Sequence, residues 1–345
     1  MSTITILALD AHGGDQGLDV SVPAALNALK ADEKLRIILV GDESEIERLL
    51  AGTALRSVAK FRERISIQAA ESVIPMDART SAILRRGKSS SMWNAFELVA
   101  EGKADACISG GSTAAMMVLG VKLIGTLPGI QRPALMGYVP NTKGHTSLLD
   151  LGANLNVSVK QLVQFAVMGS VTASLVDGIE NPSVGLLNVG HEDSKGHDLL
   201  REAHGMLNEL PLNYAGFIEG HDIFNGKVDV AVCDGFVGNL IIKSSEGLSR
   251  MMLNDLKTTL DESWASRLGA LLAGPALRRL LVRTDPSSHN GAPLLGLNGV
   301  AIKSHGGADC NGMTRAILEA GREARRQVPK KIEASIHKYH LETTS

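Results

Sequence analysis

The chain has 345 residues, of which 44% are hydrophobic and 21% are charged, as is ordinary for a folded globular protein. A net charge of −2 and an aromatic content of 3% exclude the basic surface and the stacking rings that nucleic-acid-binding proteins use. The sequence shows neither a secretory signal nor an apolar run of roughly 18–20 residues, so we expect a cytoplasmic protein.

In chain order, the first half alternates short apolar strands with helices. Strands are expected at residues 3–9, 35–40, 65–69 and 106–108, and helices at 20–30, 43–51 and 92–101. The strands are apolar on both faces, which is typical of a parallel sheet covered by helices. Asp19 or Ser21 is expected to cap the first helix, and one of Ser89–Ser91 the third.

The second half continues the same alternation. Strands are expected at 133–139, 147–150, 184–188, 217–219, 228–233 and 299–302, and helices at 158–175, 198–208, 240–260 and 313–327. The pattern predicts a doubly wound, three-layer α/β/α fold, in one domain over residues 1–345 with one or two lobes. The basic tail after Pro329 is expected to face solvent.

Residues 264–282 differ in character, because leucines recur there at helical spacing with Arg278, Arg279 and Arg283 close by. A Gly274-Pro275 pair is expected to break the helix. We predict a protruding helical hairpin at about 248–283, apolar on one side and basic on the other. Such a surface either packs against the body or a second subunit, or touches a membrane or an acyl-chain carrier.

The turn Ser109-Gly110-Gly111-Ser112-Thr113 lies between a buried strand and an apolar helix. Such a turn lets backbone N–H groups converge on an anion at the positive end of the helix dipole, while Ser112 and Thr113 add hydroxyl donors. The alternative is that it is only a tight connection.

Similar polar, glycine-containing turns follow other strands, at residues 10–15, 188–196, 234–239 and 304–309. If the strands are mostly parallel, several of these turns lie along one edge of the sheet. The sequence lacks a G-x-S-x-G elbow and a GxxxxGK[ST] loop. The turns therefore favour anion binding and direct group transfer, without an obvious covalent nucleophile.

The three cysteines, Cys107, Cys233 and Cys310, are far apart and form no C-x-x-C pair. We expect small buried thiols and neither a disulfide nor a metal site.

Seven segments taken together carry a resemblance to a known family. They are ALDAHGGD (8–15), the 109–113 turn, LLDLGAN (148–154), VGLLNVGHEDSKG (184–196), VCDGFVGN (232–239), GAPLLG (291–296) and NGVAIKSHG (298–306). In this order they resemble the PlsX family of phosphate acyltransferases, over about residues 3–320. The resemblance implies an isocitrate/isopropylmalate dehydrogenase-like fold related to the phosphotransacetylases.

The resemblance also implies an activity. It is the transfer of an acyl group from acyl-[acyl-carrier-protein] to inorganic phosphate, giving acyl phosphate for phospholipid synthesis. No metal or cofactor is implied. The implied partners are acyl carrier protein, a second copy in a homodimer, the membrane surface and a membrane glycerol-3-phosphate acyltransferase.

On this basis each residue of interest has an expected role. Ser109, Gly110, Gly111, Ser112 and Thr113 are expected to bind phosphate, with Lys88 or Lys195 supplying positive charge. Asn188, Asn239 or His305 would donate to the thioester carbonyl oxygen, and Asp10, Gly13, Gly14, Asp15 and Asp234 would order the loops. Arg278, Arg279 and Arg283 would dock the acidic carrier protein, and the acyl chain would lie along 264–282 or a dimer interface.

The chain departs from the usual family pattern at a few positions. His12 replaces the usual Met, Ser112 the usual Asn, Ala115 the usual Gly, His191 the usual Thr and Ser89 the usual Asp. Three other readings stay open. They are a phosphotransacetylase that uses acyl-CoA, a metal-dependent 2-hydroxy-acid dehydrogenase, and a non-enzymatic scaffold that binds carrier or membrane.

Overall fold

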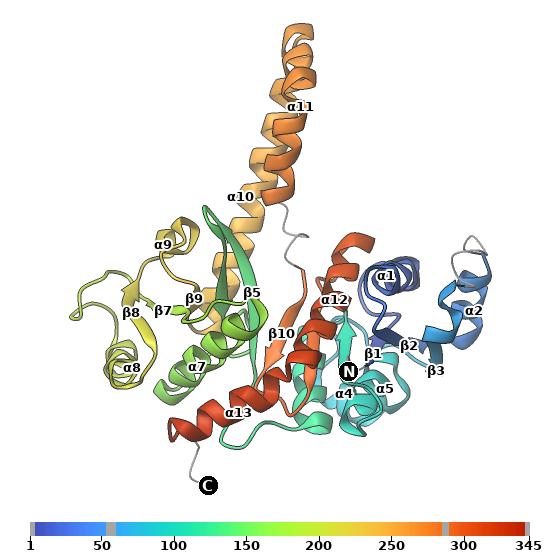
Figure 1. Cartoon of the computed structure of the whole chain (residues 1–345), viewed down its shortest axis with the longest axis horizontal. Coiled ribbons are helices and arrows are strands. Elements are labelled where there is room, and N and C mark those ends of the chain that lie inside the picture. Colours follow the sequence, from blue (N-terminus) through green and yellow to red (C-terminus); the bar gives the residue numbers. More distant parts are fainter. Residues whose placement is uncertain (1–3, 53–59, 285–289, 342–345) are drawn as a thin grey trace.

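The computed structural model describes residues 4–52, 60–284 and 290–341, and strands and helices alternate along these segments (Figure 1). The strands are β1 (Thr5–Asp10), β2 (Leu35–Gly41), β3 (Ile65–Ala69), β4 (Ala106–Ser109), β5 (Ala134–Asn141), β6 (Gly144–Leu149), β7 (Ser183–Leu187), β8 (Asn213–Ile218), β9 (Val230–Val232), β10 (Ala292–Leu295) and β11 (Val300–Lys303).

The α-helices are α1 (Leu18–Ala31), α2 (Glu43–Gly52), α4 (Thr80–Arg86), α5 (Ser91–Ala100), α6 (Thr113–Leu119), α7 (Val159–Val176), α8 (Asp198–Glu209), α9 (Gly220–Asn225), α10 (Gly235–Asp261), α11 (Trp264–Thr284), α12 (Cys310–Arg326) and α13 (Val328–Lys338). Short helical turns occupy Arg62–Arg64, Gly87–Ser89 and Gly120–Ile124.

All the described strands form one sheet, in the order β3-β2-β1-β4-β11-β10-β5-β6-β9-β7-β8. The first five run parallel to one another, and so do the last four. Between these sets, β10 is antiparallel to both of its neighbours, and β5 is antiparallel to β6. The two parallel sets therefore run in opposite directions.

Because of this reversal, only some of the strand-end turns share one edge, as the sequence predicts for several of them. The physical cause is local. Only two residues connect β5 to β6, and so short a connection forces an antiparallel pair. The carboxyl ends of β1, β4 and β11 lie at one edge, whereas those of β6, β9 and β7 lie at the other.

Helices cover both faces of the sheet, which confirms the predicted three-layer α/β/α class. Over the first parallel set, α1 and α12 pack on one face and α5 and α6 on the other. Over the second set, α7, α8 and α13 pack on one face and α9 and α10 on the other. Large apolar side chains fill both halves, with Phe96 and Phe165 completely buried.

Local capping follows the sequence in two helices and departs from it in a third. Ser90 caps α5 by accepting the Trp93 N–H at 3.2 Å, and Ser158 forms a capping box with Gln161 at the start of α7. By contrast, α1 begins after Gly17 without a side-chain cap. The hydroxyl of Ser21, one of the two predicted caps, instead donates to the Ala11 carbonyl at 2.5 Å.

The basic residues of the C-terminal tail face solvent as predicted, but the tail also has a buried face. It forms α13, which buries Val328, Ile332 and Ile336 against the second half. These residues stand four apart, so they line one face of a helix, and the basic residues occupy the opposite face.

The predicted hairpin is present and consists of α10 and α11, which project together from the body (Figure 1). Its turn falls at residues 262–263, and α11 continues through Pro275 without the predicted break. A proline removes one helical hydrogen bond but does not by itself reverse the chain. The side chains of Arg278, Arg279 and Arg283 lie outside the described part of the structure.

One helix of the described residues, α7, is long and apolar enough to cross a membrane by length and composition. However, 67% of it is buried inside the protein, where it packs between α8 and α13.

Candidate active site

The carboxyl ends of β1, β4 and β11 bring three loops together at one edge of the sheet. Asp10, Ser109 and Lys303 are the last residues of these neighbouring strands, and Lys303 is in register with Ser109. The Ser109 hydroxyl donates to Asp10 Oδ2 at 2.6 Å, and the Ser304 N–H donates to the Ser109 carbonyl at 2.9 Å. This cluster unites three of the turns that the sequence singles out.

The loop at 10–15 packs closely on the 109–113 turn. A Cβ atom on Gly13 would lie 2.6 Å from Asp10 Oδ2 and 2.8 Å from Ser109 Oγ, so only glycine fits there. The Asp15 N–H donates to the Gly306 carbonyl at 2.8 Å. These contacts agree with the expected role of Asp10, Gly13, Gly14 and Asp15 in ordering the loops.

The 109–113 turn ends at the start of α6. Ser109 Oγ accepts the Gly111 N–H at 3.0 Å, and Ser112 is the N-cap, accepting the Ala115 N–H at 3.5 Å. The N–H groups of Thr113 and Ala114 have no partner within the helix, because they belong to its first turn. Ser112 stands where the family usually has Asn, and both residue types can serve as an N-cap.

The sequence does not single out Lys303, which the structure places in the centre of this cluster. Its Nζ donates to the Gly110 carbonyl at 3.1 Å and to the Ser304 carbonyl. Burial lowers the pKa of Lys303 to about 8, although the charge of Asp15 opposes the shift. The available signal is its place at a strand end, directly before Ser304-His305-Gly306.

His305 lies in the same cluster, in the loop that follows β11. Its Nδ1 accepts the Gly307 N–H at 3.1 Å, and burial lowers the pKa of the imidazole. At pH 7 the ring is therefore neutral and carries its proton on Nε2, where it can be donated. Asn290, which the sequence also does not single out, fixes this loop by accepting the His305 N–H at 2.9 Å.

Helix α10 connects the second half to this cluster. Asp234 is its N-cap and accepts the Val237 N–H at 2.9 Å, in keeping with a loop-ordering role. Asn239 and Lys243 stand four residues apart, so they share one face of the helix. The charge of Lys243 contributes to lowering the pKa of both Lys303 and His305, so this lysine acts on the cluster through its charge.

Asn188 and Lys195 are brought together with each other but not with the 109–113 turn. The Asn188 Nδ2 donates to the Lys195 carbonyl at 3.3 Å, in the loop that follows β7. In the sheet, β7 is six positions from β4 and runs in the opposite direction.

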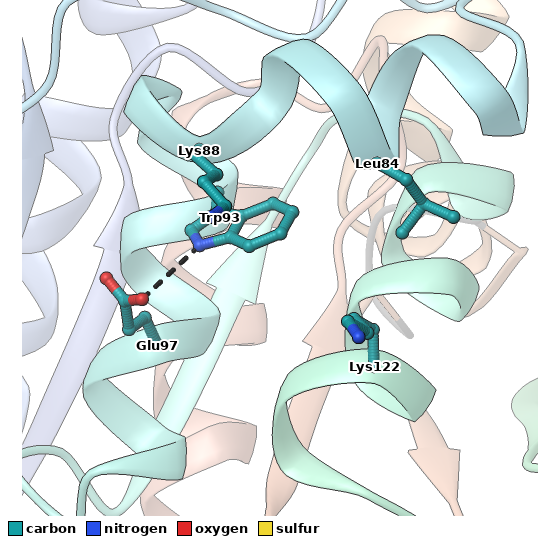
Figure 2. Close-up of a pocket in the computed structure, with 5 residues that line it drawn as sticks. All are labelled: Leu84, Lys88, Trp93, Glu97 and Lys122. Carbon is teal, nitrogen blue, oxygen red and sulfur yellow. Dashed lines mark hydrogen bonds between the residues drawn. The ribbon is translucent and has the colours of Figure 1, made fainter.

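Lys88 lines a cavity of about 660 Å³ together with Leu84, Trp93, Glu97 and Lys122, between α4, α5 and the short helical turn Gly120–Ile124 (Figure 2). The Trp93 indole donates to Glu97 Oε1 at 3.4 Å. Within the described segments no hydrogen bond or ion pair joins Lys88 to the 109–113 turn.

Two histidines that depart from the family pattern make structural contacts. His12 Nε2 accepts the Asp42 N–H at 3.0 Å, at the corner between β2 and α2. His191 lies 2.7 Å from Asp222 Oδ2 and 3.1 Å from Glu219 Oε1.

Among the residues that the structure describes, no group of three histidines, cysteines or acids could hold a metal ion. The three cysteines are free thiols, and Cys107 and Cys233 are buried.

The sequence and the fold of this chain are similar to those of known proteins. The sequence model of the family described as fatty acid synthesis protein matches residues 5–331. A phosphate acyltransferase of Nitrosococcus oceani is 48% identical over 330 residues, covering 96% of each chain. The chain belongs to the PlsX family of phosphate acyltransferases. A second family member, from Shewanella amazonensis, is 45% identical over the full length of both chains.

Family membership makes this protein an enzyme, a phosphate acyltransferase. Its fold is shared with solved structures of low sequence identity. A phosphotransacetylase from Streptococcus pyogenes has a TM-score of 0.61 at 19% identity, covering 93% of this chain and 94% of that one. A branched-chain phosphotransacylase from Enterococcus faecalis has a TM-score of 0.57 at 14% identity, covering 93% and 99%.

Proposed function

We propose that this phosphate acyltransferase transfers the acyl group of acyl-[acyl-carrier-protein] to inorganic phosphate, and that the acyl phosphate feeds phospholipid synthesis. The observation that carries the proposal is the convergence of Lys303, His305 and the 109–113 turn at the ends of β1, β4 and β11. A cation, a neutral imidazole donor and unpaired helix amides are the groups that a dianion attacking a carbonyl requires.

In this proposal a phosphate oxygen attacks the thioester carbonyl carbon and a C–O bond forms. The turn holds the phosphate, which replaces a bimolecular encounter by a fixed approach. The carbonyl oxygen becomes an oxyanion, which His305 Nε2–H or the Asn239 amide stabilises by donating a hydrogen bond. The intermediate then collapses, the C–S bond breaks, and the carrier leaves as a thiolate that needs little acid help.

Asn188 and Lys195 stay in the proposal as residues that approach the substrate from the second half of the sheet. Their loop follows β7, and Asn188 Oδ1 is buried without a partner among the described residues. An acyl donor that lies along α10 and extends from one edge of the sheet to the other would contact these two residues as well as the cluster around Lys303. Lys88, by contrast, faces its own cavity beside Trp93.

The acyl donor has one serious alternative, acyl-CoA. The shared fold with phosphotransacetylases favours it, because those enzymes carry the same α/β scaffold. The basic segment of α11 with Arg278, Arg279 and Arg283 favours the carrier protein, whose surface is acidic.

The projecting hairpin supports the proposed contacts of the enzyme. Trp264, Leu271 and Leu272 are each at least 76% exposed, and contiguous exposed apolar surface marks an interface. We propose a cytoplasmic enzyme that forms a homodimer and associates peripherally with the membrane. There its product would reach a membrane glycerol-3-phosphate acyltransferase.

The proposal is tested by supplying the purified enzyme with a long-chain acyl-carrier-protein or the matching acyl-CoA, each with inorganic phosphate. We expect acyl phosphate at a higher rate from the carrier thioester. Faster turnover of acyl-CoA would establish the phosphotransacetylase alternative. Carrier or membrane binding without turnover would establish a scaffold, and metal-dependent NAD reduction a dehydrogenase.

A further inference from the structure

Lys303 carries a charge that is not paired with a carboxylate in the part of the chain that the structure describes. Its Nζ contacts two backbone carbonyls, those of Gly110 and Ser304. Within the described residues no carboxylate forms an ion pair with it. The Asp10 carboxylate accepts the Ser109 hydroxyl, and Asp15 and Asp10 act on the lysine only through their charges. The nearby cation, Lys243, is paired with Glu246 at 3.0 Å.

An ammonium group in this position is unfavourable without an anion. Burial removes water from it, and its two carbonyl partners offer partial charges only. A lysine ammonium has three N–H donors, of which the recorded contacts use two. One donor and one full positive charge remain beside the 109–113 turn.

We propose that Lys303, and not Lys88 or Lys195, is the residue whose charge binds inorganic phosphate in the proposed acyl transfer. Its bond to the Gly110 carbonyl couples the charge directly to the turn that leads to the first amides of α6. Lys88 lies beside Trp93 in a separate cavity, and Lys195 follows a strand that ends at the opposite edge of the sheet. This inference rests on the proposed function for its substrate.

The proposal predicts a specific pH dependence. Only the ammonium form binds the dianion, and burial sets the pKa of Lys303 at about 8. Raising the pH from 7 to 9 therefore removes most of the binding form, and the KM for the phosphate dianion should rise about tenfold. The dianion fraction of inorganic phosphate increases over the same range, so the KM expressed as total phosphate should rise less. Lys303→Arg keeps the charge over this range, so its phosphate KM should change far less between the two pH values.

The test compares the full-length wild type with Lys303→Met, Lys303→Arg and Lys88→Met. Lys122→Met is the control at an exposed lysine that lines the same cavity as Lys88. The phosphate KM is measured at pH 7 and pH 9. Binding of inorganic phosphate alone is measured by calorimetry. We expect Lys303→Met to weaken phosphate binding at pH 7 by about tenfold or more, with Lys88→Met and Lys122→Met close to wild type.

A phosphate affinity of Lys303→Met within twofold of wild type would overturn the proposal, as would a wild-type pH dependence in Lys303→Arg. Calorimetry needs no acyl donor, so it tests Lys303 even if the wild type makes no acyl phosphate. A wild type that makes no acyl phosphate would contradict only the proposed function. If Lys303→Met fails to fold by circular dichroism, the pH profile of Lys303→Arg decides.

Discussion

At the scale of single residues, the structure buries several ionisable groups away from the candidate site. Glu323 on α12 is 2% exposed, and its Oε1 has no hydrogen-bond partner among the described residues. Burial raises its pKa well above 4.5, and the charges of Glu319 and Asp177 raise it further, while Arg322 opposes them. Burial likewise raises the pKa of Glu319, to which the Tyr138 hydroxyl donates at 3.4 Å.

This arrangement predicts that stability falls as the pH rises. When the pKa of a carboxyl group is raised by folding, the folded protein keeps a proton that the unfolded chain releases above its ordinary carboxyl pKa. The stabilisation that is present at low pH is therefore lost as the pH rises. Glu323→Gln removes the part of this dependence that comes from Glu323, while Glu319 keeps its own contribution. We expect the variant to be more stable than wild type at pH 8, by on the order of 1 kcal/mol, with a smaller difference at pH 5.

Urea unfolding at both pH values measures this effect, with Glu333→Gln, at an exposed position on α13, as the matched control. An unchanged pH dependence in Glu323→Gln would show that the buried carboxyl does not take up the proton.

At the scale of secondary-structure elements, α10 is the piece that connects the two halves of the site. It begins against the loop after β6, where a Cβ atom on Gly238 would overlap the Asp150 carbonyl oxygen. Further along the same helix, a Cβ atom on Gly247 would meet nothing within 4 Å. The same substitution should therefore have opposite effects at the two positions.

We expect Gly238→Ala to destabilise the protein by about 1–3 kcal/mol or more, because backbone must move to admit the methyl group. It should also lower activity, since α10 carries Asn239 and Lys243. Gly247→Ala should stabilise the protein by roughly 0.5–1 kcal/mol, because alanine loses less conformational freedom in a helix. Thermal unfolding measures both, and equal stability of the two variants would refute the close approach at Asp150.

At the scale of the whole molecule, the projecting hairpin is the part that the protein body does not cover. Leu271 and Leu272 are 76% and 77% exposed there, while Leu155, in the body, is 63% exposed. Replacing both hairpin leucines by Glu should weaken binding to vesicles of anionic phospholipid by at least about tenfold, because each buried leucine contributes about 1.5–3 kcal/mol. Leu155→Glu should leave vesicle binding unchanged.

The readout is co-sedimentation with vesicles, and activity on soluble substrate should persist in the double variant. If vesicle binding is retained and the variant instead becomes monomeric in gel filtration, the exposed face serves the second subunit and not the membrane.

The sequence alone predicts part of the fold and part of the candidate site. The strand–helix rhythm predicts the three layers, and the 109–113 turn predicts a helix N-terminus with Ser112 beside it. The reversal of the sheet is not predicted, because the expected strands at 133–139 and 147–150 stop short of the two-residue connection that makes β5 and β6 an antiparallel hairpin.

Lys303 is missed for a different physical reason. Its environment comes from Gly110, 193 residues away in the chain, and no local pattern encodes that contact. In sequence it is a lysine at the end of an apolar strand, where an exposed side chain is the ordinary outcome. Only the pairing of β11 with β4 brings it beside the turn.

The central claim is that phosphate takes the acyl group directly from a carrier thioester. It is tested most directly by measuring acyl phosphate and free carrier thiol in the same reaction of wild-type enzyme with a long-chain acyl-carrier-protein. We predict equal amounts of the two products, and none of either when phosphate is omitted. Thiol released without phosphate, or acyl phosphate formed only when acyl-CoA replaces the carrier thioester, would contradict it.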